Sequence, residues 1–559
     1  MEKLSQELID HITSFVCYGD LDQVLTVSKA FQASVETTTL KKFTLKQDNV
    51  DKFLQLYTSD RIRHLRTVRF RSTFPMVKGE YDEEHKEKGC REKSSDLAKK
   101  DRLFSQHIKF LFETLKHLEE KVGPGKLDGR LRLTIFPPSR AIDWPCRHRD
   151  SVCWRVHLRA PETLPQLRSI SYLCLKAGTY FDPLKRKHAD PELFWLHAEP
   201  KLDLRIILDL ASRLPSLERL KYRLRSVYSG SHATDESKRH YLKDWAGPHR
   251  DTRHDFARSA EHINLPSSLK HLELNFYPRN NEYRDQRELL PNFVLPYQYD
   301  HFSSSLRLLS YQLESMVLRV TADNTLFWPT DGTTPRWPNL KRLEVKFTPD
   351  SPSGAWYFQG PQGEGSDAPP GYEIAKAHYE PMDPNPTDEH YHKDPFVDAY
   401  IDQICAQFRI VPIEKNLQPF LAAFAKAAAC MPSLQKALLW TELEFEPSDI
   451  YDHYESLLAE IDASSLERNS LGWGIAYSKP KESIAFENIG HEHCASRQFW
   501  WMTGDWRPDE TLQSMFHNIG QLEHGSEVVD HWASDYGHKW CSWKMFLKAG
   551  LGRGPWYRD

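Results

Sequence analysis

The N-terminal segment carries a regular pattern of apolar positions. Leu4, Leu8, Ile12 and Phe15 are separated by four, four and three residues, so all four lie on one face of a helix. Ser5 can act as the N-cap, because a serine oxygen satisfies a free N–H group of the first helical turn. The spacing therefore predicts an amphipathic helix that begins just after Ser5.

Two further short helices follow in the same segment. Asp20 with Gln23 resembles a capping box, and the apolar members of that second helix are Leu21, Val24, Leu25 and Val27. Ser28 can cap a third helix that carries Phe31 and Val35. About 40 residues is close to the lower limit for a self-supporting core. We therefore expect this unit to dock onto the rest of the chain, onto another protein, or onto both through different faces.

Farther along, one phrase recurs: a proline, then a leucine, then alternating apolar residues. The copies are LPQLRSISYLCL from Leu164, LPSLERLKYRL from Leu214, LPSSLKHLELNF from Leu265, WPNLKRLEVKF from Trp337 and MPSLQKALLW from Met431, with a weaker copy, LESMVLRV, from Leu313. Proline ends a preceding helix and favours extended backbone before it, and alternation is typical of a strand. Each phrase thus predicts a strand, and apolar helical patterns precede several of them.

Repeated strands of this kind are the pattern of a leucine-rich-repeat solenoid. The first three prolines lie about fifty residues apart, against about 20 to 29 in the usual repeat. The repeats therefore carry long insertions, or the chain forms an irregular curved α/β sheet. An ordinary α/β domain in which the phrase recurs by chance is the alternative.

Other segments can be assigned from their polarity. KKFTLKQ, around Phe43, alternates as a strand does, and Arg102 to Lys121 has the apolar spacing of an amphipathic helix. Gly79 to Asp101 is dense in Lys and Glu and predicts a loop. Residues 228–262 are polar and resemble an insertion, and Ser351 to Pro395, rich in Pro, Gly, Asp and His, predicts an irregular excursion.

The N-terminal residues resemble a known family. The order Leu4, Glu7-Leu8, Ile12, Phe15, Leu21, Leu25, Val27-Ser28-Lys29 and Phe31 is similar to an F-box. The resemblance implies a module that docks onto a Skp-type adaptor and, through it, onto a cullin-RING ubiquitin ligase. The implied adaptor contacts are Leu4, Leu8, Ile12, Leu21, Leu25, Val27 and Phe31. Two positions depart from the pattern: Ser5 stands where a proline is usual, and Phe31 where a tryptophan is common.

The whole layout also resembles a group of large fungal F-box proteins of unassigned substrate. The matching elements are RHLRTVRF, GEYDEE, RLFSQHIKFLFETL and MPSLQKALLW. The resemblance implies an α/β fold class, with a three-helix F-box followed by an irregular leucine-rich-repeat-like solenoid. The implied divisions are an F-box at 1–40, a repeat-like α/β domain at 41–350, a Pro/Gly-rich loop insertion at 351–395 and a Trp-rich, repeat-like C-terminal region at 396–559.

Composition narrows the expected location. The chain has 559 residues and a formal net charge of −4, so no global charge draws it to nucleic acid or to membranes. Nine cysteines without paired spacing favour a reducing compartment. The acidic, amphipathic N-terminus is not a signal peptide, and the longest nearly apolar run, Phe420 to Met431, is too short to cross a bilayer. We expect the cytoplasm or the nucleus.

No residue pattern predicts catalysis, a cofactor or a metal. The His and Cys groups are His491, His493 and Cys494, then Cys146, His148 and Cys153, then His390 and His392. None has the ligand spacing of a tetrahedral zinc site, so polar loops are favoured. Neither a nucleotide-binding loop nor a nucleophile elbow occurs. We therefore expect a protein that is not an enzyme, although an unrecognised enzyme in the C-terminal region is a third hypothesis.

Two further patterns bear on recognition. In RIRHLRTVRFR, Arg69 and Arg71 alternate with Val68 and Phe70, which favours a solvated sheet face over a nucleic-acid-binding patch. The same face could contact an acidic substrate peptide, weakly and in a salt-dependent way. The last 120 residues hold nine of the sixteen tryptophans, which suits either a core or a recognition surface.

The patterns and the resemblance together predict the substrate-recognition subunit of an SCF (Skp-cullin-F-box) ubiquitin ligase. The N-terminal helices would bind the adaptor, and the repeat region would bind a protein substrate that the sequence does not name. The alternative is a repeat scaffold whose F-box-like cap is only structural. We expect neither nucleic acid nor a membrane as a partner.

Overall fold

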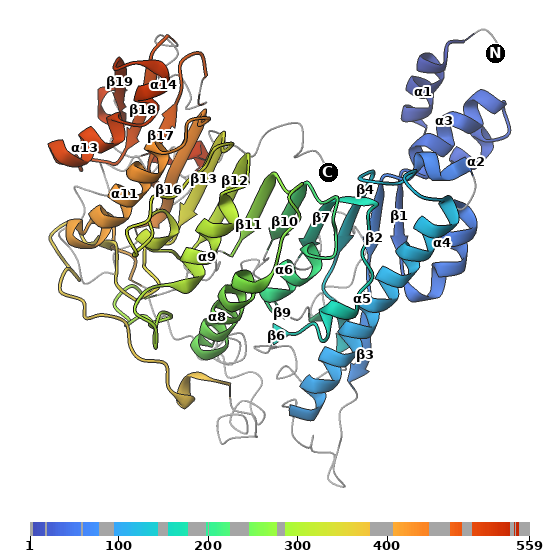
Figure 1. Ribbon diagram of the computed structural model, residues 1–559, viewed down its shortest axis with the longest axis horizontal. Helices are drawn as coiled ribbons and strands as arrows, with labels where there is room; N and C mark the ends of the chain where they lie inside the picture. Colours follow the sequence, from blue (N-terminus) through green and yellow to red (C-terminus); the bar gives the residue numbers. More distant parts are fainter. Residues whose placement is uncertain are drawn as a thin grey trace.

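The computed structural model describes residues 4–16, 20–57, 60–77, 94–142, 155–176, 197–198, 201–223, 245–276, 285–380, 406–445, 470–482, 484, 495–536, 541–542 and 544–546. It begins with the helices α1 (Gln6–Phe15), α2 (Leu21–Val24) and α3 (Lys29–Thr39) (Figure 1). Ser5 and Ser28 accept hydrogen bonds from the backbone N–H groups of Leu8 and Phe31, which confirms both predicted N-caps. The predicted cap at Asp20 is wrong: its backbone is already helical, and its side chain makes no capping hydrogen bond.

The rest of the chain is organised around one continuous sheet. Its strands, in spatial order, are β1 (Lys42–Leu45), β2 (Thr67–Phe70), β4 (Leu131–Ile135), β7 (Ile170–Lys176), β10 (Arg219–Arg223), β11 (His271–Asn275), β12 (Ser315–Val320), β13 (Arg342–Phe347), β16 (Lys436–Glu444), β17 (Ser470–Ser478), β18 (Arg497–Met502) and β19 (Val528–Trp532). The strands from β1 to β16 are parallel. β17 is antiparallel to both neighbours, β19 is parallel to β18, and β20 (Cys541–Ser542) also pairs with β17. The predicted α/β architecture is confirmed as a mixed fold with a large, mostly parallel sheet.

The recurring phrase of the sequence corresponds to neighbouring strands. Its six copies supply β7, β10, β11, β12, β13 and β16, which lie side by side in this order. The leucine that follows each proline is buried, as at Leu167, Leu217 and Leu340. In-register pairing then stacks the same apolar position from strand to strand, for example Leu173, Leu220 and Leu272. The prediction that each phrase leads into a strand is confirmed.

Helices cover one face of this sheet. They are α4 (Val50–Tyr57), α5 (Ser94–Val122), α6 (Arg205–Ala211), α8 (Ala246–His262), α9 (His301–Ser310), α11 (Glu414–Ala429), α13 (Glu510–His517) and α14 (Gln521–His524). Figure 1 shows α5, α6, α8 and α9 on the same side of the strands. Parallel neighbours need long crossover connections, which these helices supply. One hydrophobic cluster runs between the two layers from Leu45 to Ile519.

Two polar segments were predicted wrongly in part. Ser94 to Asp101, expected to be loop, forms the first turns of α5, because Leu97 is buried and Asp101 accepts a hydrogen bond from the backbone N–H of His157 at 3.0 Å. Within 228–262, the helix α8 buries Phe256 and an Arg253–Asp300 ion pair of 2.6 Å. The remaining parts of both segments, residues 79–93 and 228–244, lie outside the described residues.

Residues 351–380 are mostly irregular, as predicted, and they are held against the sheet. β14 (Phe358–Gln359) pairs with β15 (Val411–Pro412). The buried guanidinium of Arg409 donates to the carbonyl oxygens of Phe358 and Gly365, both at 3.0 Å. Burial lowers the pKa of Arg409 to about 10. Minor sheets join β3 (Thr73–Val77), β5 (Ser139–Ile142) and β8 (His197–Ala198), and β6 (Arg155–Val156) with β9 (Lys201–Leu202).

The C-terminal tryptophans form core. Trp440, Trp473, Trp500 and Trp501 are fully buried. Trp440 and Trp500 belong to a second hydrophobic cluster that includes Phe546, and alternation places this cluster on the sheet face opposite the main one. The sheet is therefore covered on both faces at this end. Trp540, Trp543 and Trp556 lie outside the described residues.

Candidate functional site

The N-terminal helices leave apolar side chains uncovered. Nine large apolar residues are exposed in the described part of the chain, and five of them fall within its first 27 residues: Leu4, Leu8, Ile12, Phe15 and Val27. We call these five residues the α1 surface. Leu8 is 51% exposed and Phe15 is 75% exposed. Grouped apolar exposure of this kind marks an interaction site more often than scattered single residues do.

The described part of the chain does not cover this face of α1, because the helix packs through its other side. Ile9 and Thr13, one turn apart, are the buried residues of α1, and α1 contacts α3. A polar contact supports the packing: Gln6 donates to the carbonyl oxygen of Ala30 at 3.4 Å. Hydrogen bonds from Ser34 and Gln6 also hold the pKa of the exposed Asp10 carboxyl below its usual value.

The seven residues implied as adaptor contacts divide into two groups. Leu4, Leu8, Ile12 and Val27 are exposed, and Leu25 is half-buried. Leu21 and Phe31 are buried, so their side chains hold the three helices together. Phe15, which the sequence placed on the same face but outside the implied contact set, is the most exposed of the α1 surface. Its i+11 spacing from Leu4 was the signal for including it.

The helical unit is joined to the sheet by a short series of polar contacts. Glu36 of α3 accepts a 2.9 Å ion-pair contact from Arg61. The hydroxyl of Tyr57 donates to the carbonyl oxygen of Leu40 at 2.8 Å. These contacts orient α3 above the first strands, and α1 lies beyond it at the edge of the molecule (Figure 1).

The sheet face opposite the helices, which we call the open face, carries polar side chains in rows. Because the strands are in register, one row consists of Lys42, Thr67, Arg132, Tyr172, Arg219, His271, Ser315, Arg342 and Lys436. Burial lowers the pKa of Arg219, and the nearby Arg132 lowers it further. Burial also lowers the pKa of His271, and Arg219 is the next cause. Neighbouring positive charges in this row therefore lower the pKa of the basic groups beside them.

From β10 onward, many open-face cations have carboxylate partners. Lys221 lies 2.8 Å from Glu273, and Arg223 lies 3.3 Å from the same carboxylate. At the entry to the strands, Glu314 contacts Lys341 at 2.7 Å and Lys270 at 3.3 Å. Lys346 pairs with Glu442 and also lies over the ring of Trp440.

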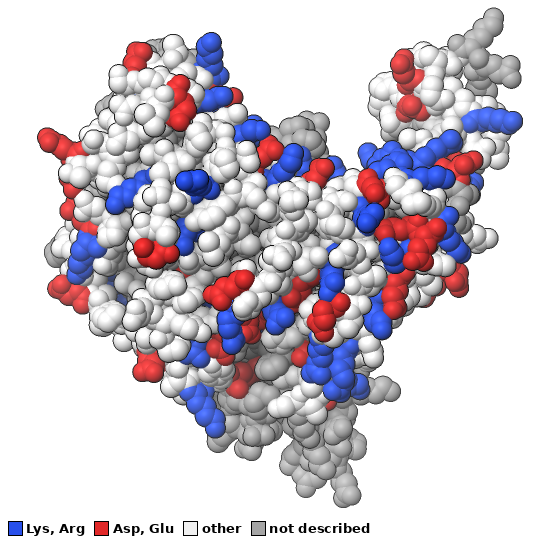
Figure 2. Space-filling model, viewed as in Figure 1, with Lys and Arg blue, Asp and Glu red and all other residues white. Residues whose placement is uncertain are grey.

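The open face differs over the first strands, where it is hollowed into a pocket of about 340 Å³. The lining residues are Lys41, Lys42, Arg66, Thr67, Arg69, Arg132, Thr134, Tyr172 and Lys176. We call this the basic pocket: six of its nine residues are cationic and none is acidic. Figure 2 shows Lys and Arg side chains gathered where the N-terminal helices meet the sheet. The alternation predicted for Arg69 and Arg71 is confirmed, since Val68 and Phe70 are buried behind them.

Sequence reasoning found only part of this pocket. It singled out the arginine-rich segment RIRHLRTVRFR, which contains Arg66 and Arg69. Lys42, Arg132 and Lys176 were missed, because they come from separate strands that only the sheet register brings together. The alternation of basic and apolar residues in each strand was the available signal.

Within the described residues, no group of His, Cys, Asp and Glu side chains could hold a metal ion. The candidate histidines and cysteines named from the sequence, at 146–153, 390–392 and 491–494, lie outside those residues. No helix in the described part of the chain has both the length and the apolar character needed to cross a bilayer. Comparison with known proteins finds no family model and no curated protein that matches this chain.

Proposed function

We propose that this chain is the substrate-recognition subunit of an SCF ubiquitin ligase. In this proposal, the three N-terminal helices are an F-box that binds a Skp-type adaptor and, through it, a cullin-RING ligase. The repeat-like sheet, in the manner of a leucine-rich-repeat solenoid, binds a protein substrate. Catalysis by this chain is not needed, because holding a substrate near a charged ubiquitin-conjugating enzyme raises its effective concentration.

The observation that carries the proposal is the α1 surface. Residues that the F-box resemblance implies as adaptor contacts, such as Leu8 and Ile12, are exposed rather than packed against the sheet. Burying a Leu or Phe side chain stabilises a complex by about 1.5–3 kcal/mol relative to leaving it in water. A partner that covers α1 would gain this term several times over, without displacing any contact among the described residues.

Leu8→Asp and Phe15→Asp test the adaptor interface directly. Both side chains are exposed, so the variants should fold as the parent does, while an aspartate in an apolar interface would be buried without a partner. We expect the affinity for a purified Skp-type adaptor to fall at least about tenfold in each variant. Binding is measured by titration calorimetry or by capture on immobilised adaptor.

Leu522→Asp is the matched control. Leu522 lies on α14 and is 93% exposed, so the substitution changes charge and hydrophobicity in the same way at the opposite end of the molecule (Figure 1). Adaptor capture should be unchanged in this variant. If Leu8→Asp and Phe15→Asp bind the adaptor as well as Leu522→Asp does, the helical unit is only a structural cap. The chain would then be a repeat scaffold.

The same variants identify substrates. A chain carrying Leu8→Asp keeps the sheet intact, so bound proteins should accumulate on it without becoming ubiquitinated. Proximity labelling with the parent and with this variant would compare the two sets of neighbours. Proteins enriched on the variant and ubiquitinated only with the parent are the expected substrates, and an identical ubiquitination pattern would contradict the proposal.

A further inference from the structure

The basic pocket is lined by residues separate from those of the α1 surface. We propose that it binds a compact small molecule that carries several phosphate groups. The six cations come from β1, β2, β4, β7 and the residues just before β1 and β2, and they converge on one hollow of about 340 Å³. Small-molecule sites are typically clefts of about 300–1,000 Å³, so the size fits such a ligand.

Charge balance sets the class of ligand. None of the ion pairs among the described residues involves Lys41, Lys42, Arg66, Arg69, Arg132 or Lys176. A phosphate monoester carries about −1.5 to −2 at neutral pH. One phosphate group would therefore leave most of the cationic charge uncompensated, whereas about three would balance it. Guanidinium groups favour phosphate oxygens because their N–H donors bind two oxygens at once.

The register of the strands places the cations at spacings that suit neighbouring phosphates. Lys42, Thr67 and Arg132 form one row across β1, β2 and β4. Arg69 and Thr134 lie opposite each other in the next row on the same face. Adjacent strands lie about 4.8 Å apart, so Lys42 and Arg132 face the pocket from positions about 10 Å apart. The hydroxyls of Thr67 and Thr134 add neutral donors between them.

Two of these cations, Arg66 and Arg132, are held in place before any ligand binds. The guanidinium of Arg66 donates to the carbonyl oxygens of Arg63 at 2.7 Å and Leu65 at 3.0 Å. The guanidinium of Arg132 lies over the ring of Tyr172, 5.7 Å from its centroid. A pocket with oriented donors loses less conformational entropy when a ligand binds.

The surroundings favour a compact ligand over a long polymer. Beyond β7, the open face carries Glu273 and Glu314, each already paired with two cations. A nucleic acid or an extended acidic peptide leaving the pocket along the sheet would meet cations that already have carboxylate partners. Phosphate groups would have to compete with those carboxylates for the cations there. The six cations of the pocket make no ion pair with another described residue, which suits a ligand that ends there.

The position of the pocket predicts a second effect. Lys41 lies just beyond α3, and its carbonyl oxygen accepts hydrogen bonds from the N–H groups of Arg66 and Thr67, both at 3.0 Å. A ligand held by Lys41, Arg66 and Arg69 would therefore join the starts of β1 and β2 beneath the helical unit. Ligand binding to the folded state alone raises the melting temperature, so thermal unfolding gives an independent readout.

The test is titration calorimetry on the full chain without an adaptor, at physiological ionic strength. The probes are myo-inositol hexakisphosphate, tripolyphosphate, inorganic phosphate, a singly phosphorylated peptide and a single-stranded oligonucleotide. We expect one saturable site for the first two probes, with much weaker binding of the other three. Tighter binding of inositol hexakisphosphate than of tripolyphosphate indicates a cyclic polyol phosphate, and the reverse order a linear one. Either order supports the proposal.

Two double variants that each remove two positive charges distinguish binding in the pocket from a general effect of net charge. Arg69→Gln with Arg132→Gln removes two pocket cations, and the affinity should fall about ten- to a hundredfold. Lys270→Gln with Lys341→Gln removes two exposed cations that pair with Glu314, and the affinity should stay within about twofold. The melting temperature of each unliganded variant checks that it is folded.

The proposal fails if no probe gives a saturable site, or if both double variants weaken binding equally, since net charge alone would then explain it. It also fails if the phosphopeptide or the oligonucleotide binds more tightly than the compact probes, because the site would then serve a macromolecule. These results do not depend on adaptor binding. Failure here leaves the proposed ligase function standing, and failure of adaptor capture leaves the pocket standing.

Discussion

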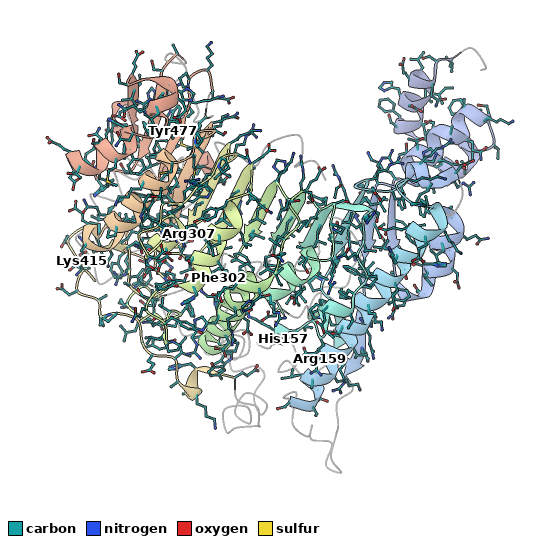
Figure 3. The ribbon with its side chains drawn as sticks, viewed as in Figure 1. His157, Arg159, Phe302, Arg307, Lys415 and Tyr477 are labelled. Atoms are coloured by element: carbon teal, nitrogen blue, oxygen red, sulfur yellow. The ribbon has the colours of Figure 1, made fainter. Side chains whose placement is uncertain are left out.

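The two ends of the molecule differ in how far their apolar and charged side chains are buried or paired. At the C-terminal end, apolar groups cover both faces, and Trp440 packs on Phe546 with ring centroids 5.2 Å apart. At the N-terminal end, the α1 surface is exposed, and the described residues that line the basic pocket include six cations and no acidic residue. Figure 3 shows the two ends on opposite sides of the molecule, with Tyr477 at the C-terminal end. The C-terminal end therefore buries its apolar groups within the chain, whereas the N-terminal end leaves apolar and cationic groups uncovered by the described residues.

Replacing one phenylalanine at each end should give the largest difference in the free energy of unfolding. Phe516 of α13 is fully buried and lies 5.2 Å from the ring of Trp501, whereas Phe15 of α1 is mostly exposed. We expect Phe516→Ala to lower the free energy of unfolding by about 3–5 kcal/mol. Phe15→Ala should change it by no more than about 0.5 kcal/mol. Urea unfolding followed by tryptophan fluorescence measures both, and a large loss for Phe15→Ala would mean that this side chain is covered by its own chain.

Replacing one paired and one unpaired cation of the open face should give a smaller difference in the free energy of unfolding. Lys221 is buried and lies 2.8 Å from Glu273, so Lys221→Gln should lower the free energy of unfolding by about 1–3 kcal/mol. Arg132 is exposed among other cations, and Arg132→Gln should be neutral or stabilising by up to about 0.5 kcal/mol. The measurement is urea unfolding in low salt, where like-charge repulsion is strongest. Equal losses in the two variants would contradict the contrast between the paired and unpaired halves.

Lowering the pH should reduce stability more through the carboxyl groups of the C-terminal end than through those of the N-terminal end. Burial alone would raise the pKa of Asp530, but hydrogen bonds from His517, Trp501 and Gln513 outweigh it, and the pKa is lowered. A carboxyl whose pKa is lower in the folded state adds stability above its unfolded pKa, near 4. That stability is lost as the pH falls through the folded pKa.

Unfolding curves between pH 6 and pH 3 measure this effect. The parent should lose stability over the acidic part of the range, and Asp530→Asn should flatten the profile. Asp10 of α1 also has a lowered pKa, through hydrogen bonds from Ser34 and Gln6, but it is fully exposed. Asp10→Asn should therefore change the profile less than Asp530→Asn does, and a larger change at Asp10 would reverse the proposed difference between the ends.

Local patterns predicted much of the fold. Ser5 and Ser28 act as N-caps as predicted, because capping depends on residues within one helical turn. Five proline phrases and the weaker copy from Leu313, which lacks the proline, identified six strands, because a proline and an alternating run act on the adjacent backbone. Polarity alone misled at Ser94–Asp101, where the buried Asp101 finds its partner at His157, far along the chain.

The amino-acid sequence by itself determined the starts of α1 and α3, the six strands of the recurring phrase, and which side chains share a face. The tertiary structure decided which of those faces stay free. Leu8 and Ile9 are adjacent and equally apolar, yet only packing against α3 buries Ile9 and leaves Leu8 outside. The register of the strands likewise places Lys221 beside Glu273, with which it forms an ion pair. It places Arg132 beside Thr67 and Tyr172, which carry no charge to pair with it. The physical reason is that burial and charge pairing depend on neighbours brought together across the sheet, whereas capping and alternation depend on neighbours along the chain.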